Sequence, residues 1–70
     1  MKHLRVEVNS IANATSKTQI KNALDKIEGV DEVSVDRAES TIKVEYKEPA
    51  TEQVIKNTIE HAGHKIEREW

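Results

Sequence analysis

The periodicity of apolar residues changes several times along this chain of 70 residues, and these changes restrict its fold more than any other feature. Three segments alternate apolar and polar side chains, as strands with one buried face do: 3–8, 30–36 and 41–47. Two segments repeat apolar residues at helical spacing: Ile20, Ala23, Leu24 and Ile27 in the first, and Val54, Ile55, Thr58, Ile59 and Ala62 in the second. A last short alternating segment covers residues 64–69, with His64 and Ile66 on one face. The pattern therefore predicts the order strand, helix, strand, strand, helix, strand.

The predicted strands are apolar on one face only, so both helices are expected to cover the same face of one sheet. Right-handed crossovers in the two strand–helix–strand units then give an α+β fold, the ferredoxin-like βαββαβ sandwich with a four-stranded antiparallel sheet. The length leaves room for a single domain, residues 1–70. The expected core consists of Leu4, Val6, Val8, Ile20, Leu24, Ile27, Val33, Val35, Ile42, Val44, Val54, Ile55, Ile59 and Ile66.

Polar residues at the predicted helix ends suggest where each helix starts and stops. Ser16 followed by Gln19 fits a capping box, while Asn13 and Thr15 are interpreted as turn residues of the loop 9–16. Gly29 lies beyond the first helical stripe, where a left-handed residue commonly ends a helix. For the second helix, Thr51 is the predicted N-cap, Glu52 lies in the first turn and Gly63 closes the end.

Composition excludes several classes of function. The chain has no cysteine, which removes disulfides, thiolate nucleophiles and metal sites built on cysteine sulfur. Its 11 basic and 13 acidic residues give a net charge of -2, a poor match to nucleic acid. The longest run of apolar residues is two, so we expect no membrane insertion and a cytoplasmic location.

The water-facing side of the sheet is expected to be a solvated, charged surface with opposite charges on adjacent strands. Its predicted members are Arg5, Glu7, Glu32, Asp36, Lys43, Glu45, Lys65 and Glu67. RNA-recognition domains of this topology stack bases on aromatic residues of the central strands. Because Lys43 and Glu45 stand at those positions here, we expect no RNA binding.

Catalytic side chains are not grouped anywhere in the sequence. Ser10 or Ser16 could be combined with His64 and an aspartate, but no motif supports such a triad, and the loop 9–16 has no arginine or lysine to hold a phosphate. We therefore expect no enzyme. The histidines His3, His61 and His64 are scattered, and Gly63 separates the last two. His64 is two residues before Ile66 and therefore lies on the same face of the predicted strand, which predicts that His64 lies at the rim of the core.

Residues around the first loop and at two later points of the chain form one pattern. Val8, Ser10, Ile11, Asn13 and Ser16 are followed by Gly29-Val30 at the start of the second strand and by Ala62-Gly63-His64 near the end. The stretch 4–66 resembles the heavy-metal-associated domain of copper chaperones and of the cytosolic parts of copper and zinc pumps. That family usually reads V-x-G-M-x-C-x-x-C at the end of its first strand. By this resemblance Ser10 takes the place of the glycine, Ile11 of the methionine, and Asn13 and Ser16 of the two cysteines.

The resemblance implies a metal site whose ligands are missing. Cu(I) favours two thiolates, whereas Asn13 offers a neutral amide and Ser16 a protonated hydroxyl. We expect no high-affinity metal and no cofactor, with His64, Asn13 and Ser16 as the candidates for loose binding of a divalent ion.

Three functions are compatible with the sequence. The preferred one is a monomeric, non-enzymatic domain of the metal-trafficking lineage that recognises another protein domain or regulates it, through Ile11, Lys17 and His64 beside the first loop. Ile11 has a second interpretation, since the family's methionine fills the core beneath the loop. One alternative is a metal-binding protein with ligands other than cysteine around His64. The other is a small-molecule sensor of the ACT type, although those domains carry a glycine in the first loop. Met1 and Trp70 at the ends favour a free-standing protein.

Overall fold

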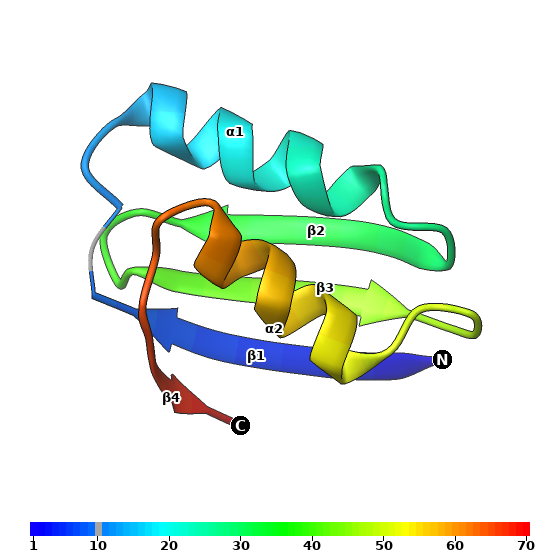
Figure 1. Ribbon diagram of the computed structural model, residues 1–70. Helices are drawn as coiled ribbons and strands as arrows, with labels where there is room; N and C mark the ends of the chain where they lie inside the picture. The colour runs from blue at the N-terminus through cyan, green and yellow to red at the C-terminus, as the bar shows by residue number, and fades with distance from the viewer. Residues whose placement is uncertain (10) are drawn as a thin grey trace.

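The computed structural model describes residues 1–9 and 11–70 of the chain and shows a sheet with two helices on one of its faces (Figure 1). The elements of the described part are β1 (Lys2–Val8), α1 (Ala14–Asp25), β2 (Val30–Asp36), β3 (Thr41–Tyr46), α2 (Glu52–His61) and β4 (Ile66–Glu69). The strands lie in the order β2-β3-β1-β4, and all neighbours are antiparallel. This arrangement confirms the predicted βαββαβ sandwich.

The register of the sheet brings the apolar residues of three strands to the face under the helices. Leu4 of β1 lies opposite Val44 of β3, and Val6 lies opposite Ile42. On the other side of β3, Val33 of β2 also pairs with Val44. Residues that alternate along a strand point to opposite faces, so these pairs form a continuous apolar layer. The helices contribute Ile20, Leu24, Ile55 and Ile59, which are all almost fully buried.

Three of the predicted core residues are less buried than expected. Val54 is 45% exposed, while Ile27 and Ile66 are only partly buried at the edge of the core. The buried stripe of α2 consists of Ile55 and Ile59, four residues apart, so Val54 lies about 100° around the helix from Ile55 and faces away. Three apolar residues that were not in the predicted list, Ile11, Tyr46 and Ala50, are instead buried.

The two helices begin with side-chain caps, one of which differs from the prediction. Asn13 is the N-cap of α1, with its Oδ1 accepting the Ser16 backbone N–H at 2.9 Å. The prediction of Ser16 as the cap is wrong, because the helix starts earlier and Ser16 occupies its third position. Thr51 caps α2 as predicted, and its hydroxyl accepts the Val54 N–H at 3.2 Å.

Candidate functional site

Three connections meet at the end of the molecule where β1 ends, on the left in Figure 1. The Val8 backbone N–H donates to the Ser40 carbonyl oxygen at 2.8 Å, which holds the β2–β3 turn beside the end of β1. Asn9 holds the segment before β4, since its N–H donates to the Lys65 carbonyl at 3.0 Å and its Oδ1 accepts the Lys65 N–H at 3.2 Å. The end of β1 is therefore held from both sides. Ser10, which the resemblance placed on the family's glycine, lies outside the described residues.

Ile11 is a core residue and not a surface anchor. It is 6% exposed and belongs to the same apolar cluster as Val8 and Ile20. Of its two interpretations, burial supports the one in which Ile11 fills the space beneath the loop, as the family's methionine does. A partner protein cannot gain an apolar contact from this side chain without unpacking the core, so Ile11 is removed from the candidate docking surface.

The two positions that correspond to cysteines already interact with each other. The carboxamide oxygen of Asn13 is occupied by the Ser16 N–H, and the Asn13 carbonyl accepts the Lys17 N–H at 3.2 Å. Asn13, which caps α1, is exposed, and Ser16, at the third position of the helix, is half-buried. A neutral carboxamide whose oxygen already accepts a hydrogen bond from the helix N-terminus is a poor ligand for a metal ion. The Asn13 carboxamide and the Ser16 backbone amide are thus arranged as a helix cap.

His64 lies in the turn between α2 and β4, where it is half-buried. Its backbone N–H donates to the Ile59 carbonyl at 3.4 Å. Since β4 begins at Ile66, the predicted strand 64–69 starts two residues too early, and His64 belongs to the turn. Among the described residues, no three histidine or acidic side chains are grouped so that they could hold a metal ion. Lys17, the other candidate docking residue, is exposed on the first turn of α1.

One ion-pair network was not evident from the sequence. Lys56 of α2 contacts Glu69 of β4 at 2.9 Å and Glu52 of its own helix at 3.3 Å. The hydrogen bonds to Glu69 and then to Glu52 raise the pKa of Lys56, and the hydrogen bond from Lys56 lowers the pKa of Glu69. Helical spacing alone could have suggested the Lys56–Glu52 pair. The contact with Glu69 depends on how α2 crosses β4.

The outer face of the sheet corrects another expectation. Adjacent strands were expected to pair opposite charges, and Glu7 of β1 does lie opposite Arg68 of β4. In the rest of the sheet, however, Arg5 of β1 lies opposite Lys43 of β3, and Glu45 of β3 lies opposite Glu32 of β2. The attractive contact across β1 and β3 is His3 Nδ1 to Glu45 Oε1, at 3.5 Å. Like charges therefore stand side by side in two rows.

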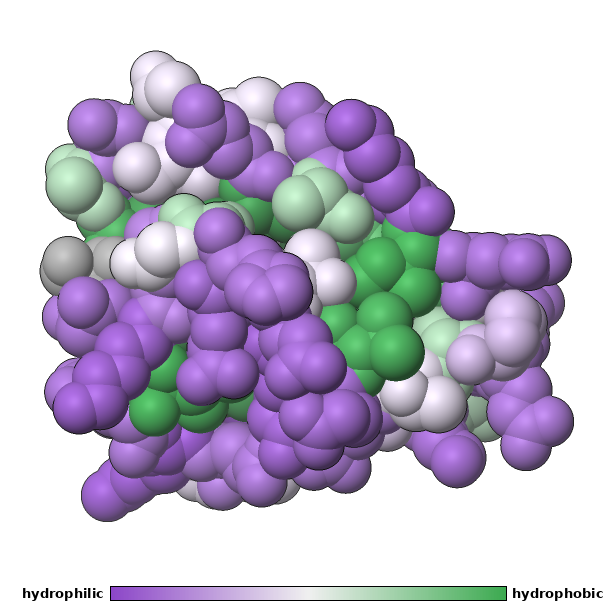
Figure 2. Space-filling view, in the orientation of Figure 1, coloured by the Kyte–Doolittle hydropathy of each residue, from purple (hydrophilic) through white to green (hydrophobic). Residues whose placement is uncertain are grey.

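The surface around the helices gives a further view of the molecule. Figure 2 shows that hydrophilic side chains cover most of this face, with apolar surface visible between the helices. No helix within residues 1–9 and 11–70 is long and apolar enough to cross a membrane.

Comparisons with known proteins agree with the fold and the framework of the loop. Residues 5–65 match the heavy-metal-associated domain family. A copper-binding domain from HMA7, a P-type ATPase, has a TM-score of 0.88 and 28% identity, over 100% of both chains. The N-terminal domain of a potential copper-translocating P-type ATPase from Bacillus subtilis, solved with Cu(I) bound, has a TM-score of 0.84 and 27% identity, over 97% of this chain and 89% of that one.

A metallochaperone, CopZ, shares the fold with a TM-score of 0.89 and 21% identity, over 94% of this chain and 100% of the other. Comparison with curated protein sequences finds no match. The family match covers the loop, both helices and most of the sheet, so the alternative of an ACT-type sensor has no support.

Proposed function

This chain belongs to the heavy-metal-associated domain family, and from that premise we propose that it is a non-enzymatic module that recognises another protein and does not bind Cu(I) tightly. The observation that carries the proposal is the hydrogen bond from the Ser16 N–H to Asn13 Oδ1 at 2.9 Å. The two positions that supply thiolates in the family here supply a helix cap. The fold of the metal-trafficking lineage is kept without its usual ligands.

The chemistry of the loop supports the absence of tight Cu(I) binding. Cu(I) is a soft ion that selects thiolate and thioether sulfur, and the chain contains no cysteine. Its methionine, Met1, is exposed before β1, away from the β1–α1 loop. Transfer of an ion by exchange between cysteine pairs is therefore not open to this domain, and a role in the same lineage must rest on contacts between proteins.

For divalent ions we propose loose binding at most, with His64 as the anchor and Asn13 or Ser16 as helpers. One imidazole with two neutral oxygens lacks the charge and the fixed partners of a tight site. Titration with Zn(II), Ni(II) and Cu(II), followed by NMR of the loop amides and the His64 imidazole, tests this. Shifts that saturate at micromolar metal would contradict loose binding.

The docking surface is expected to be polar because Ile11 is buried. Lys17 is exposed beside the cap, and the His64 turn lies at the same end of the molecule (Figure 1). A partner domain with an acidic surface fits this arrangement, since an exposed lysine steers association more than it adds affinity. Domains of this family that carry cysteines are the first partners to test.

A competition titration tests the metal part of the proposal. The wild-type domain and the double variant Asn13→Cys, Ser16→Cys compete with a chromophoric Cu(I) chelator. We expect the wild type to leave the chelator fully loaded and the variant to withdraw Cu(I). The control is Thr15→Cys, Thr18→Cys, which has the same cysteine spacing on exposed positions of α1. Cu(I) retention by the wild type, or equal retention by both variants, would contradict the proposal.

The partner part is tested by NMR with a cysteine-bearing heavy-metal-associated domain from the same genome. Binding through the proposed surface shifts the amides of Asn13, Lys17 and His64. Lys17→Glu is expected to weaken these shifts, whereas Lys47→Glu, an exposed lysine after β3, leaves them unchanged. Equal effects of both substitutions would show that the loop end is not the interface.

A further inference from the structure

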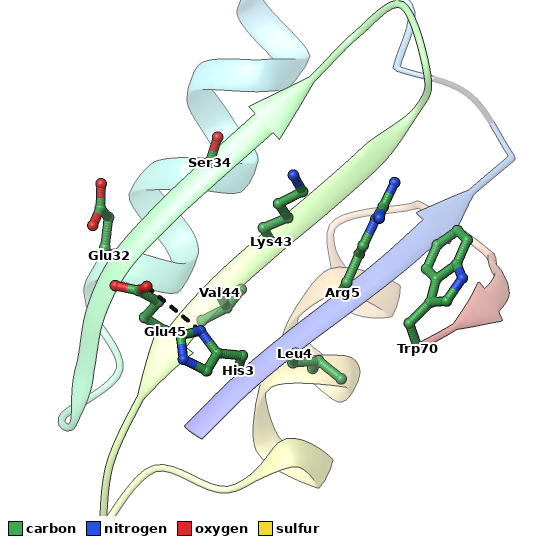
Figure 3. A pocket seen from close by; sticks show the side chains of 9 residues that line it. All are labelled: His3, Leu4, Arg5, Glu32, Ser34, Lys43, Val44, Glu45 and Trp70. Atoms are coloured by element: carbon green, nitrogen blue, oxygen red, sulfur yellow. Dashed lines mark ion pairs between the residues drawn. The ribbon is translucent and has the colours of Figure 1, made fainter. Parts of the chain in front are cut away.

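The outer face of the sheet, opposite to the helices, carries a groove of about 450 Å³. Figure 3 shows side chains from β1, β2 and β3 around it, with Trp70 at one side. Its floor is formed at Leu4 and Val44, whose side chains belong to the core on the other side of the sheet. The groove is therefore separate from the β1–α1 loop and from the surface proposed above for protein recognition.

One end of the groove is positive. Arg5 and Lys43 lie opposite each other on β1 and β3, and neither forms an ion pair within the part of the chain that the structure describes. The Arg5 guanidinium lies 4.4 Å from the centre of the Trp70 ring, which holds the side chain in place. Its Nε is buried and has no hydrogen-bond partner among the described residues. Two like charges placed directly opposite each other repel, and an anion between them removes that repulsion.

The other end of the groove is negative. Glu45 of β3 lies opposite Glu32 of β2, and both line the groove. His3 contacts Glu45 at 3.5 Å from the β1 side, an ion pair only when the imidazole is protonated. Lys43 and Glu45 are two residues apart on one strand, so the positive and negative ends are separated by about 7 Å. The groove thus has a fixed electric polarity along the strand direction.

We propose that this groove binds a small zwitterionic organic molecule, with its carboxylate between Arg5 and Lys43 and its ammonium between Glu32 and Glu45. A carboxylate accepts charge-assisted hydrogen bonds from a guanidinium and an ammonium, and the ammonium of the ligand donates to carboxylates. A short aliphatic spacer between the two charges spans the groove and lies against its floor. This inference does not depend on the proposed protein-recognition role, because the two sites share no residue.

A second copy of the chain is a less suitable occupant. In an antiparallel face-to-face arrangement, the positive row of one copy would meet the negative row of the other. A flat, charged sheet face, however, would not fill the groove. The large apolar residue at this face is Trp70, which is 52% exposed and has the guanidinium groups of Arg5 and Arg68 at 4.4 Å and 5.5 Å from the centre of its ring. A small molecule that enters the groove meets both charged ends and the floor together.

The test is an NMR titration of the full chain with three matched probes: δ-aminovalerate, valerate and n-pentylamine. They have similar length, but only the first carries both charges. We expect saturable shifts of the amides around Arg5, Lys43 and Glu45 with δ-aminovalerate at millimolar concentration. Valerate and n-pentylamine are expected to bind about tenfold more weakly or less, because each leaves one charged end unmatched. Equal binding of all three probes, or no saturable shift with δ-aminovalerate, would overturn the proposal.

Substitutions locate the site and separate it from self-association. Lys43→Gln and Glu45→Gln are each expected to weaken binding of δ-aminovalerate by about tenfold. The controls Lys65→Gln and Glu67→Gln make the same changes outside the groove and leave binding unchanged. Arg5→Gln also removes the contact with Trp70, so Lys43→Gln is the decisive positive-end variant. Equal weakening by the control substitutions would overturn the proposal. Self-association at this face would also overturn it: without ligand, the amide shifts around Arg5, Lys43 and Glu45 would then grow with protein concentration, and the protein would diffuse more slowly.

Discussion

Gly29 and Gly63 form a natural pair for measuring how much the packing of one turn contributes to stability. Both have positive φ angles, +99° and +94°, so an alanine at either position adopts a conformation that L-residues avoid. A Cβ at Gly63 meets no atom within 4 Å. A Cβ at Gly29 would lie 2.7 Å from the Ala50 backbone nitrogen, and it would also collide with the Lys47 carbonyl oxygen. The two substitutions therefore share the backbone strain and differ in the collision.

The atoms that a Cβ at Gly29 would strike cannot easily move away. The Lys47 N–H donates to the Gly29 carbonyl at 2.8 Å, and the Ala50 N–H donates to the Lys47 carbonyl at 2.9 Å. Ala50 itself is buried in the core. Left-handed backbone costs an alanine about 1–2 kcal/mol, and a collision in a packed region adds about 1–3 kcal/mol. We expect Gly63→Ala to lower the free energy of unfolding by about 1–2 kcal/mol and Gly29→Ala by about 2–5 kcal/mol.

Urea denaturation followed by far-UV circular dichroism measures both free energies of unfolding, with the wild type in parallel. A difference of about 1 kcal/mol or more between the two variants confirms that the turn 47–50 is packed against Gly29. Equal destabilisation would show that only the φ angle matters, and the close approach of the two turns would then be refuted. An unchanged m-value is required, because a shift in m would place part of the effect in the unfolded chain.

Three further outcomes are expected. Asn13→Ala removes the α1 cap and is expected to cost about 1 kcal/mol in urea denaturation, whereas Asn13→Asp is expected to be close to neutral. Ile59→Ala creates a cavity at a residue that is 1% exposed and is expected to lower the free energy of unfolding by about 2–5 kcal/mol. Val54→Ala, at a residue that is 45% exposed, is expected to lower it by under about 1 kcal/mol. Similar values for the two variants would contradict the assignment of the buried stripe of α2. The pKa of Glu69 lies below its ordinary value of 4.5 because of Lys56, so this contact stabilises the fold above that pH and is lost as the pH falls through the folded-state pKa. Lys56→Met is therefore expected to flatten the fall of Tm in acid, and an unchanged acid profile would show that the pair contributes nothing measurable.

The fold was predictable because burial alone fixes which face of each element is apolar. Leu4, Val6 and Val8 could only serve as one face of a strand, and the order of the elements followed from two periodicities. The register was not predictable, since sliding β1 by two residues along β3 keeps every apolar side chain inside. Such a slide would place Arg5 opposite Glu45, the opposite-charge pairing that the sequence suggested. The observed register places Arg5 opposite Lys43 and thereby creates the polarity of the groove.

At the candidate site the sequence did not settle two points: which residue caps α1, and whether Ile11 is buried or exposed. Asn13 and Ser16 can each cap a helix, and only the starting point of α1 decides between them. The backbone of Asn13 is extended, with φ of -157°, which places its Oδ1 on the Ser16 N–H. A serine that is already inside the helix cannot do the same for the first turn.

The Asn13 cap is a way to fix the start of α1 that needs no metal ion. A pair of ligands three residues apart at the start of a helix occupies the same positions as an N-cap and the residue whose amide it binds. A bound ion and a capping oxygen are therefore alternative ways to fix one turn of backbone. In this chain the oxygen of Asn13 holds the turn from the protein side, and Ile11 seals the core beneath it. The first turn of α1 is thus held by groups of the protein itself, which supports the proposed role in protein recognition without a bound ion.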